Sequence, residues 1–214
     1  MKYTDILWDF NGTIIDDVEA GILSVNKMLS DRGLKMIASK EEYRKIFHFP
    51  IEDYYRSLGF DFESEPYAVL APIWVELYLE NAKNAPLQPY VREAIETFSK
   101  IGVAQHVLSA SELSMLKAQL DTFGILDCFE SISGLDNIHA HSKTALALEW
   151  KKAHPDAKAL VIGDTEHDHA TAKALGADCA LIAFGHQSRE RLESCVGAKI
   201  YSSLSELIGE FLVS

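Results

Sequence analysis

Two aspartates in the sequence directly follow apolar runs, where a charged side chain is unusual. Asp9 closes the apolar run 6–8, and Asp164 follows the apolar run 159–163. A carboxylate is costly to bury alone, so such an Asp caps a strand end or turn, or it binds an ion. Two of them in matching context favour a Mg²⁺ site, because this cation prefers carboxylate oxygens. Asp168, one helical turn further on, could bind the ion directly or through water, or simply favour a helix N-terminus.

A serine closes another predicted strand. Ser109 is the last residue of the stretch 103–109. Its hydroxyl could donate to a phosphate oxygen, supported by the backbone amide of Ala110, as in strand-to-helix turns that bind anions. The alternative is that Ser109 or Ser111 only caps the following helix.

These residues need a scaffold that gathers strand ends at one edge. From residue 91 onward, strand-like and helix-like stretches alternate, which predicts an α/β protein with a Rossmann-like parallel sheet and helices on both faces. Ligands of such sheets bind beyond the carboxyl ends of the strands, where Asp9, Ser109 and Asp164 all fall. The expected strands are 6–8, 103–109, 129–133, 160–164 and 179–183, and the expected helices are 91–100, 112–123, 142–152 and 168–175, with further helices near the end.

Residues 16–87 follow a different pattern. Apolar residues recur there at three- and four-residue spacing and the strand pattern is absent. We therefore predict an all-helical cap domain over 16–87, inserted into a core domain of residues 1–15 and 88–214, with Pro86 and Pro89 in the return linker. The first helix expected within it ends near residue 33. Three further helices are expected at 41–47, 52–58 and 67–82.

The stretch TDILWDFNGT, from Thr4 to Thr13, resembles the first motif of the haloacid dehalogenase-like hydrolases. In that family an Asp nucleophile is followed two residues later by a second Asp, then by Gly and Thr. Ser109, Lys143 and the stretch 163–168 (GDTEHD) extend the resemblance over nearly the whole chain, which is most similar to the phosphoglycolate phosphatase and β-phosphoglucomutase branch. The resemblance implies a helical cap that selects the substrate, Mg²⁺ as cofactor, and an aspartyl-phosphate formed on Asp9.

Asn11 departs from that motif, because the family has its second Asp there. The resemblance implies that the backbone carbonyl of Asn11 still binds the metal. The amide side chain, however, cannot protonate a leaving oxygen or take a proton from water, so we expect slow turnover. Thr13 either hydrogen-bonds near the nucleophile or stabilises the turn. Lys143 would offset negative charge on the nucleophile and the phosphate, unless it is an ordinary surface lysine.

Other polar residues are candidates for the rim of the site. Arg44, Lys45 and His48 of the cap could hold the distal part of an anionic substrate, although helical surface charge explains the first two nearly as well. Histidines also crowd the motif-bearing loops, but their spacing matches no zinc signature, so we interpret them as rim residues. They are His139, His141, His167 and His169.

Composition limits the classes of possible binding partner. The net charge of −12 argues against nucleic acid and anionic membranes, and favours a small phosphorylated metabolite bound in a local pocket. Three cysteines without a pairing motif, and the lack of a signal-like or membrane-spanning run, predict a cytoplasmic protein with reduced thiols. Monomer and homodimer both remain open.

The leading hypothesis is therefore a Mg²⁺-dependent phosphatase slowed by Asn11. One alternative is a phosphonate hydrolase, which would need a cap lysine that forms a Schiff base; no cap lysine, among Lys27, Lys35, Lys40 and Lys45, has a context that singles it out. Carbon–halogen hydrolysis is disfavoured, because dehalogenases need no metal-binding pair such as Asp164 and Asp168. The other alternative is a weakly active or non-catalytic phosphate-binding protein.

Overall fold

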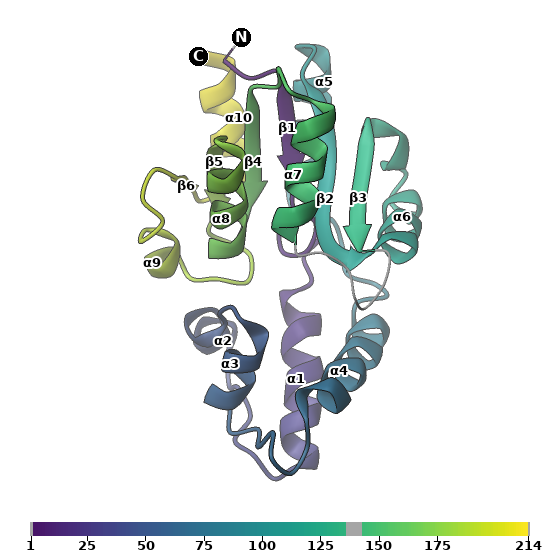
Figure 1. Cartoon of the computed structure of the whole chain (residues 1–214), viewed down its shortest axis with the longest axis vertical. Helices are drawn as coiled ribbons and strands as arrows, with labels where there is room; N and C mark the ends of the chain where they lie inside the picture. Colours follow the sequence, from purple (N-terminus) through teal and green to yellow (C-terminus); the bar gives the residue numbers. More distant parts are fainter. Residues whose placement is uncertain (1, 136–142, 214) are drawn as a thin grey trace.

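The strands of the chain pair side by side in one parallel sheet (Figure 1). The computed structural model describes residues 2–135 and 143–213. Within these residues the sheet has the strand order β3-β2-β1-β4-β5-β6, and each neighbouring pair is parallel. The predicted α/β class is confirmed. The strands are β1 (Asp5–Trp8), β2 (Ala104–Glu112), β3 (Ser131–Leu135), β4 (Ala159–Gly163), β5 (Asp178–Ile182) and β6 (Lys199–Tyr201).

Helices cover both faces of the sheet because the central strand β1 is apolar on both sides. Ile6 and Trp8 pack in one hydrophobic cluster with α5, α6 and α10, whereas Leu7 packs in another with α7 and α8. The helices of this domain are α5 (Val91–Lys100), α6 (Leu113–Thr122), α7 (Lys143–Ala153), α8 (Glu166–Leu175), α9 (Arg189–Leu192) and α10 (Leu204–Val213), with a short 3₁₀ helix at Leu126–Cys128.

Strand order reverses beside β1, and this decides where a ligand can bind. The chain runs outward from β1 through β2 to β3, then returns to place β4 on the other side of β1. Trp8 pairs with Val107 of β2 and with Ile162 of β4. The residues that follow these positions therefore meet at one end of the sheet, which we call the carboxyl edge.

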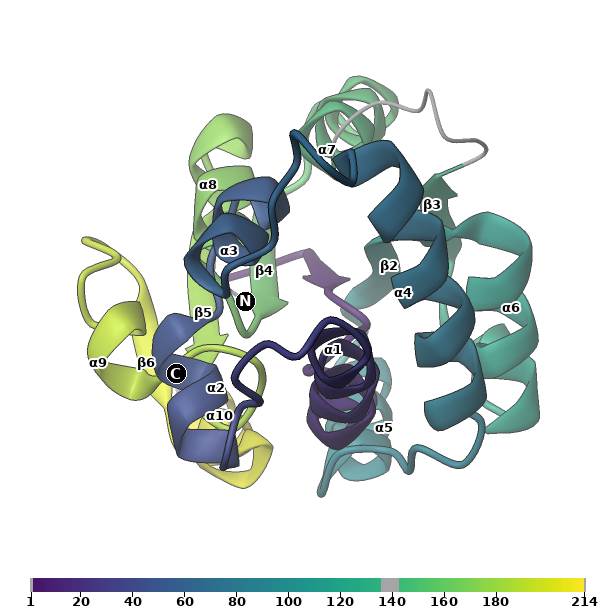
Figure 2. The same cartoon turned by 90° about the horizontal axis from the view of Figure 1, so that it is seen from below.

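A second, all-helical body faces the carboxyl edge (Figure 1). Its apolar side chains, including Met28, Tyr54 and Leu70, form a hydrophobic cluster separate from those of the sheet. Figure 2 shows α2 and α3 on one side of α1 and α4 on the other. These helices are α1 (Val18–Asp31), α2 (Lys40–Ile46), α3 (Ile51–Ser57) and α4 (Tyr67–Asn81).

The two chain segments that connect the helical body to the sheet lie side by side. The Asp16 amide donates to the Pro86 carbonyl at 2.8 Å, and the Gln88 amide donates to the Ile14 carbonyl at 2.9 Å. Ile15 also forms an isolated bridge with Leu87. The boundaries at 16 and 87 stay a prediction, and this pairing supports them.

Most strand ends shift by one or two residues from the expectation, and two strands differ more. β2 continues to Glu112, three residues past Ser109, with a shift in its register against β3 between Leu108 and Glu112. β6 was not expected, because a strand of only three residues at a sheet edge carries almost no periodic signal.

The hydrophobic cluster of the helical body, which we call the cap, yields a stability prediction. Leu70 of α4 is fully buried, while its neighbour Val69 is 51% exposed. Leu70→Ala should therefore lower the free energy of unfolding by about 2–5 kcal/mol, through lost burial and the cavity it leaves. Val69→Ala should change it by no more than about 0.5 kcal/mol. Urea denaturation of both variants measures the difference, and equal losses would contradict this packing.

Candidate functional site

Carboxylates of Asp9, Asp164 and Asp168 converge at the carboxyl edge. Three carboxylate oxygen atoms, one from each of these residues, all lie within 4.8 Å of one another. Asp9 directly follows β1 and its amide donates to the Ile162 carbonyl at 2.8 Å, which fixes it beside β4. Asp164 directly follows β4, and Asp168 lies in the first turn of α8. Asp164 and Asp168 are at most 1% exposed, and Asp9 is 9% exposed.

Lys143, the first residue of α7, lies between two of these carboxylates. Its ammonium group forms ion pairs with Asp9 and with Asp168, and its side chain is 4% exposed. Burial alone would lower the pKa of Lys143, but the Asp168 and Asp9 carboxylates outweigh it and raise the pKa. One ammonium group against three carboxylates leaves an excess of negative charge, which is a setting that favours a divalent cation.

Burial, together with the neighbouring charges, perturbs two of the carboxylates. Burial, with repulsion from Asp168 and Asp164, raises the pKa of Asp9 well above its ordinary value, although Lys143 opposes this. Burial likewise raises the pKa of Asp164 to about 6, against the opposing charge of His186. Perturbed carboxylates gathered at a strand edge are typical of functional sites.

Asp168 is held by several donors. Its Oδ2 accepts from the amides of Asp164 and Thr165, at 3.2 and 3.0 Å, and from the Thr165 hydroxyl at 2.7 Å. This is a capping box at the start of α8. Its Oδ1 contacts Lys143 at 2.5 Å. Asp168 thus performs the helix-terminus role that the sequence left open, and it also orients Lys143.

The structure places the remaining motif residues around this edge. Ser109 is 1% exposed, and its hydroxyl accepts from the Ser111 amide at 3.0 Å. Ala110 is exposed. Thr13 is fully buried, and its hydroxyl donates to Asp164 Oδ1 at 3.3 Å rather than to Asp9.

Asn11 faces the cap. Its Nδ2 donates to Asp17 Oδ2 at 2.9 Å and to the Tyr78 hydroxyl at 2.6 Å, while its Oδ1 accepts from the Ser111 hydroxyl at 2.8 Å. Asp17 and Tyr78 were not among the sequence candidates. In the sequence, Asp17 is an ordinary acidic residue before a helix, and Tyr78 is one apolar position of α4.

His186 is a further residue that sequence reasoning missed. It lies in the loop after β5, its amide donates to Asp164 Oδ2 at 2.6 Å, and its ring Nε2 lies 3.1 Å from Asp17 Oδ1. Burial alone would lower its pKa, but Asp17, with smaller contributions from Asp164 and Asp9, outweighs burial and raises the pKa of His186 to about 9. Its position shortly after the carboxyl end of β5 is the sequence feature that could have indicated a place in the site.

The three cap candidates have different environments. The Arg44 guanidinium donates to the carbonyls of Phe184 and Gly185 at 2.5 and 2.8 Å, which ties α2 to the loop after β5. Lys45 is exposed. His48 Nδ1 lies 2.7 Å from the Ile46 carbonyl within the cap. In this arrangement Arg44 joins the cap to the core, and the roles of Arg44 and His48 as substrate ligands stay predictions.

The two loop histidines that the structure describes have separate partners. His167 packs against Phe49 of the cap, with ring centroids 4.9 Å apart, and His169 Nε2 lies 3.1 Å from the Val196 carbonyl. His139 and His141 lie outside the described residues.

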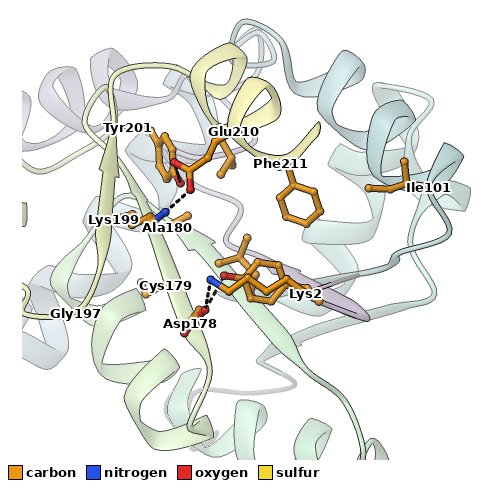
Figure 3. A pocket seen from close by; sticks show the side chains of 13 residues that line it. Lys2, Ile101, Asp178, Cys179, Ala180, Gly197, Lys199, Tyr201, Glu210 and Phe211 are labelled. Carbon is orange, nitrogen blue, oxygen red and sulfur yellow. Dashed lines mark hydrogen bonds and ion pairs between the residues drawn. The ribbon is translucent and has the colours of Figure 1, made fainter. Parts of the chain in front are cut away.

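A cavity of about 310 Å³ lies at the other end of the sheet (Figure 3). It is lined by Tyr3 and by the first residues of two strands, Asp178 and Lys199. Its charged groups pair with one another, Lys2 with Asp178 and Lys199 with Glu210. The perturbed carboxylates lie instead at the carboxyl edge, so that edge is the candidate functional site. No described helix is long and apolar enough to cross a membrane.

Curated relatives match nearly the whole chain in sequence. The chain is 29% identical over 203 residues to a phosphoglycolate phosphatase of Aquifex aeolicus, with 85% of each chain covered. It is 24% identical over 214 residues to a phosphoglycolate phosphatase of Pseudomonas savastanoi pv. phaseolicola, covering 95% of this chain and 78% of the relative.

Solved structures share the fold. A haloacid dehalogenase-like family hydrolase from Streptococcus pneumoniae superposes with a TM-score of 0.83 at 19% identity, covering 98% of this chain and 99% of the other. A mutant of CbbY from Rhodobacter sphaeroides, in complex with xylulose-(1,5)bisphosphate, superposes with a TM-score of 0.71 at 21% identity, covering 96% of both chains. The sequence profile described as haloacid dehalogenase-like hydrolase matches residues 6–182, and the chain therefore belongs to that family.

Proposed function

We propose that this protein is a Mg²⁺-dependent phosphatase that hydrolyses a small phosphorylated metabolite through an aspartyl-phosphate on Asp9. The observation that carries the proposal is the buried group of Asp9, Asp164 and Asp168 with Lys143 among them. Its relatives named phosphoglycolate phosphatase support a small phosphate ester as the substrate class.

The donor set fits a magnesium ion. Asp9, Asp164 and the backbone carbonyl of Asn11 would hold it, since Mg²⁺ prefers oxygen ligands. Asp168 already accepts from two amides, a hydroxyl and Lys143, so we assign it a contact through water. When bound, the ion would neutralise charge on the transferring phosphoryl group.

Asp9 would act as the nucleophile. One of its carboxylate oxygens forms a bond to phosphorus while the bond from phosphorus to the ester oxygen breaks. Lys143 favours the ionised form of Asp9 and offsets the charge of the phosphoryl oxygens. Water then attacks phosphorus, which releases inorganic phosphate and restores Asp9. The buried Ser109 hydroxyl, beside the strand end, is the proposed donor to a phosphoryl oxygen.

Asn11 leaves both proton transfers without a side-chain catalyst. The departing ester oxygen needs a proton, and the attacking water must lose one, but an amide does neither near neutral pH. We therefore propose slow turnover and a long-lived aspartyl-phosphate. A protein that stays phosphorylated is the limiting case of the same chemistry.

Phosphonate hydrolysis has less support. A Schiff-base lysine must lose its proton, which burial favours. Lys27 and Lys40 instead form exposed ion pairs with Asp31 and Glu19, Lys35 is 85% exposed, and Lys45 is exposed.

Magnesium should be required. In a screen of small phosphate esters, activity should appear with Mg²⁺ and disappear with EDTA. Mg²⁺ should also raise the unfolding temperature, because it relieves repulsion among the carboxylates. Asp164→Asn should lose most of that thermal response, whereas Asp156→Asn, at an exposed position, should keep it. Full activity in EDTA would exclude the proposed metal dependence.

Asp9 should carry the phosphoryl group. Incubation with a reactive phosphoryl donor and Mg²⁺ should add one phosphoryl mass to the unmodified protein, detectable by intact mass spectrometry. Asp9→Asn should take up none, and Asp156→Asn should behave like the unmodified protein. Phosphorylation of the Asp9→Asn variant would disprove the assigned nucleophile. Phosphorylation without release of phosphate would identify a phosphate-retaining protein instead of a phosphatase.

A further inference from the structure

Asp17, one residue before α1, is saturated with hydrogen-bond donors. Its Oδ1 accepts from the Gly12 amide at 2.7 Å and lies 3.1 Å from His186 Nε2. Its Oδ2 accepts from Asn11 Nδ2 at 2.9 Å and from the Tyr78 hydroxyl at 2.6 Å. The residue is 1% exposed, so these partners replace water completely. A carboxylate has about four acceptor positions, and here each is used.

The partners of Asp17 come from both domains. Asn11, Gly12 and His186 belong to the sheet domain, whereas Tyr78 belongs to α4 of the cap. His186 also donates its backbone amide to Asp164 Oδ2 at 2.6 Å. A single side chain thus links the cap, the first motif and the Asp164 side of the carboxylate group.

Asn11 can satisfy this arrangement only as an amide. Its Oδ1 accepts from the Ser111 hydroxyl while its Nδ2 donates to Asp17 and Tyr78. Because an ionised Asp17 only accepts, it dictates which end of the amide faces it. A carboxylate at position 11 would present acceptors, and a second negative charge, to an acceptor.

We propose that Asp17 is a positioning residue, and that its carboxylate makes asparagine the side chain that fits at position 11. Asn11 and Asp17 are a matched donor–acceptor pair across the cap–core junction. The missing carboxylate of the first motif follows from this pairing. Restoring it by Asn11→Asp alone breaks the pair. Restoring it together with Asp17→Asn rebuilds the pair with the roles exchanged.

The exchange has a definite geometry. In the double variant, the amide nitrogen introduced at position 17 replaces the present Oδ2 and donates to the new carboxylate at position 11. The Tyr78 hydroxyl, which now accepts from position 11 and donates to position 17, exchanges these two roles. The amide oxygen introduced at position 17 replaces the present Oδ1 and still accepts from Gly12 and His186. Ser111 still donates to position 11. Each single variant instead opposes like with like, two acceptors in Asn11→Asp and two donors in Asp17→Asn.

The test is a cycle of four proteins: unmodified, Asn11→Asp, Asp17→Asn and the double variant. Thermal unfolding should show that each single variant has a lower unfolding temperature, and that the double variant recovers at least half of the summed loss. Additive losses in the double variant would overturn the proposal. Asp16→Asn serves as the matched control, because it removes the same charge one residue away. Combined with Asn11→Asp, it should give additive losses.

The kinetic part of the test rests on the proposed phosphatase function. With alkyl phosphates and Mg²⁺, the kcat of the double variant should exceed that of the unmodified protein by about 10²-fold or more, as a general acid–base group contributes. Asn11→Asp alone should gain less than about tenfold. KM should change little, because the gain arises in the chemical step. Equal kcat gains in the single and double variants would overturn the positioning role.

Two further outcomes separate the proposals. If none of the four proteins releases phosphate while the unfolding temperatures are non-additive, the positioning role stands and the phosphatase function falls. If a single variant does not fold, the cycle is repeated with Asn11→Ala and Asp17→Ala, which remove the interaction without opposing like groups. Non-additive unfolding temperatures in that cycle support the pairing, and additive ones overturn it.

Discussion

Repulsion among buried carboxylates is the constraint on which this site depends. Asp9 and Asp164 lie at the ends of adjacent strands because β1 and β4 are paired in register, with Trp8 beside Ile162. Burial strengthens the repulsion, since little water is present to screen it. The fold offsets part of it with Lys143, placed by the start of α7, and with amide donors at the start of α8. The negative charge that remains is what a divalent cation would neutralise.

The cap is held to this charged edge by polar contacts as well as by packing. Tyr43 of α2 lies 2.9 Å from His186 Nδ1, Tyr78 of α4 donates to Asp17, and Arg44 binds carbonyls of the loop after β5. The Tyr43 and Arg44 contacts converge on the loop that also donates to Asp164, and Asp17 contacts His186 of the same loop. The position of the cap and the geometry of the first motif are therefore coupled through shared partners.

Local sequence patterns were sufficient for the residues whose role depends on a strand end. Asp9 and Asp164 close apolar runs, and a parallel sheet then brings them together whatever the details of packing. The α/β class and most helices followed from periodicity in the same way. The irregular end of β2 was harder to predict, because its register shift against β3 depends on the neighbouring strand and not on its own residues.

The Asp17 network could not be predicted from the sequence. Asp17 meets Tyr78 across 61 residues and His186 across 169, and each of these side chains has an ordinary role in its own segment. Arg44 shows the same limit. Its charge suggested a contact with an anion, and the local charge pattern does not reveal that the folded chain directs its guanidinium to backbone carbonyls.

One contact of Asp17 also bears on the chemical lifetime of the first motif. An Asn followed by Gly is prone to deamidation, in which the glycine nitrogen attacks the asparagine side-chain carbonyl and forms a succinimide ring. In this protein the Gly12 amide donates to Asp17, and both ends of the Asn11 side chain are engaged by other partners. Gly12 also has a φ of +74°, and a Cβ there would approach His186 Cδ2 to 2.6 Å, so a residue that would slow deamidation by bulk does not fit. The fold therefore requires glycine at position 12, and its contacts hold the Asn11-Gly12 pair in an arrangement that disfavours deamidation. Unfolding removes these contacts and leaves Asn11 open to deamidation.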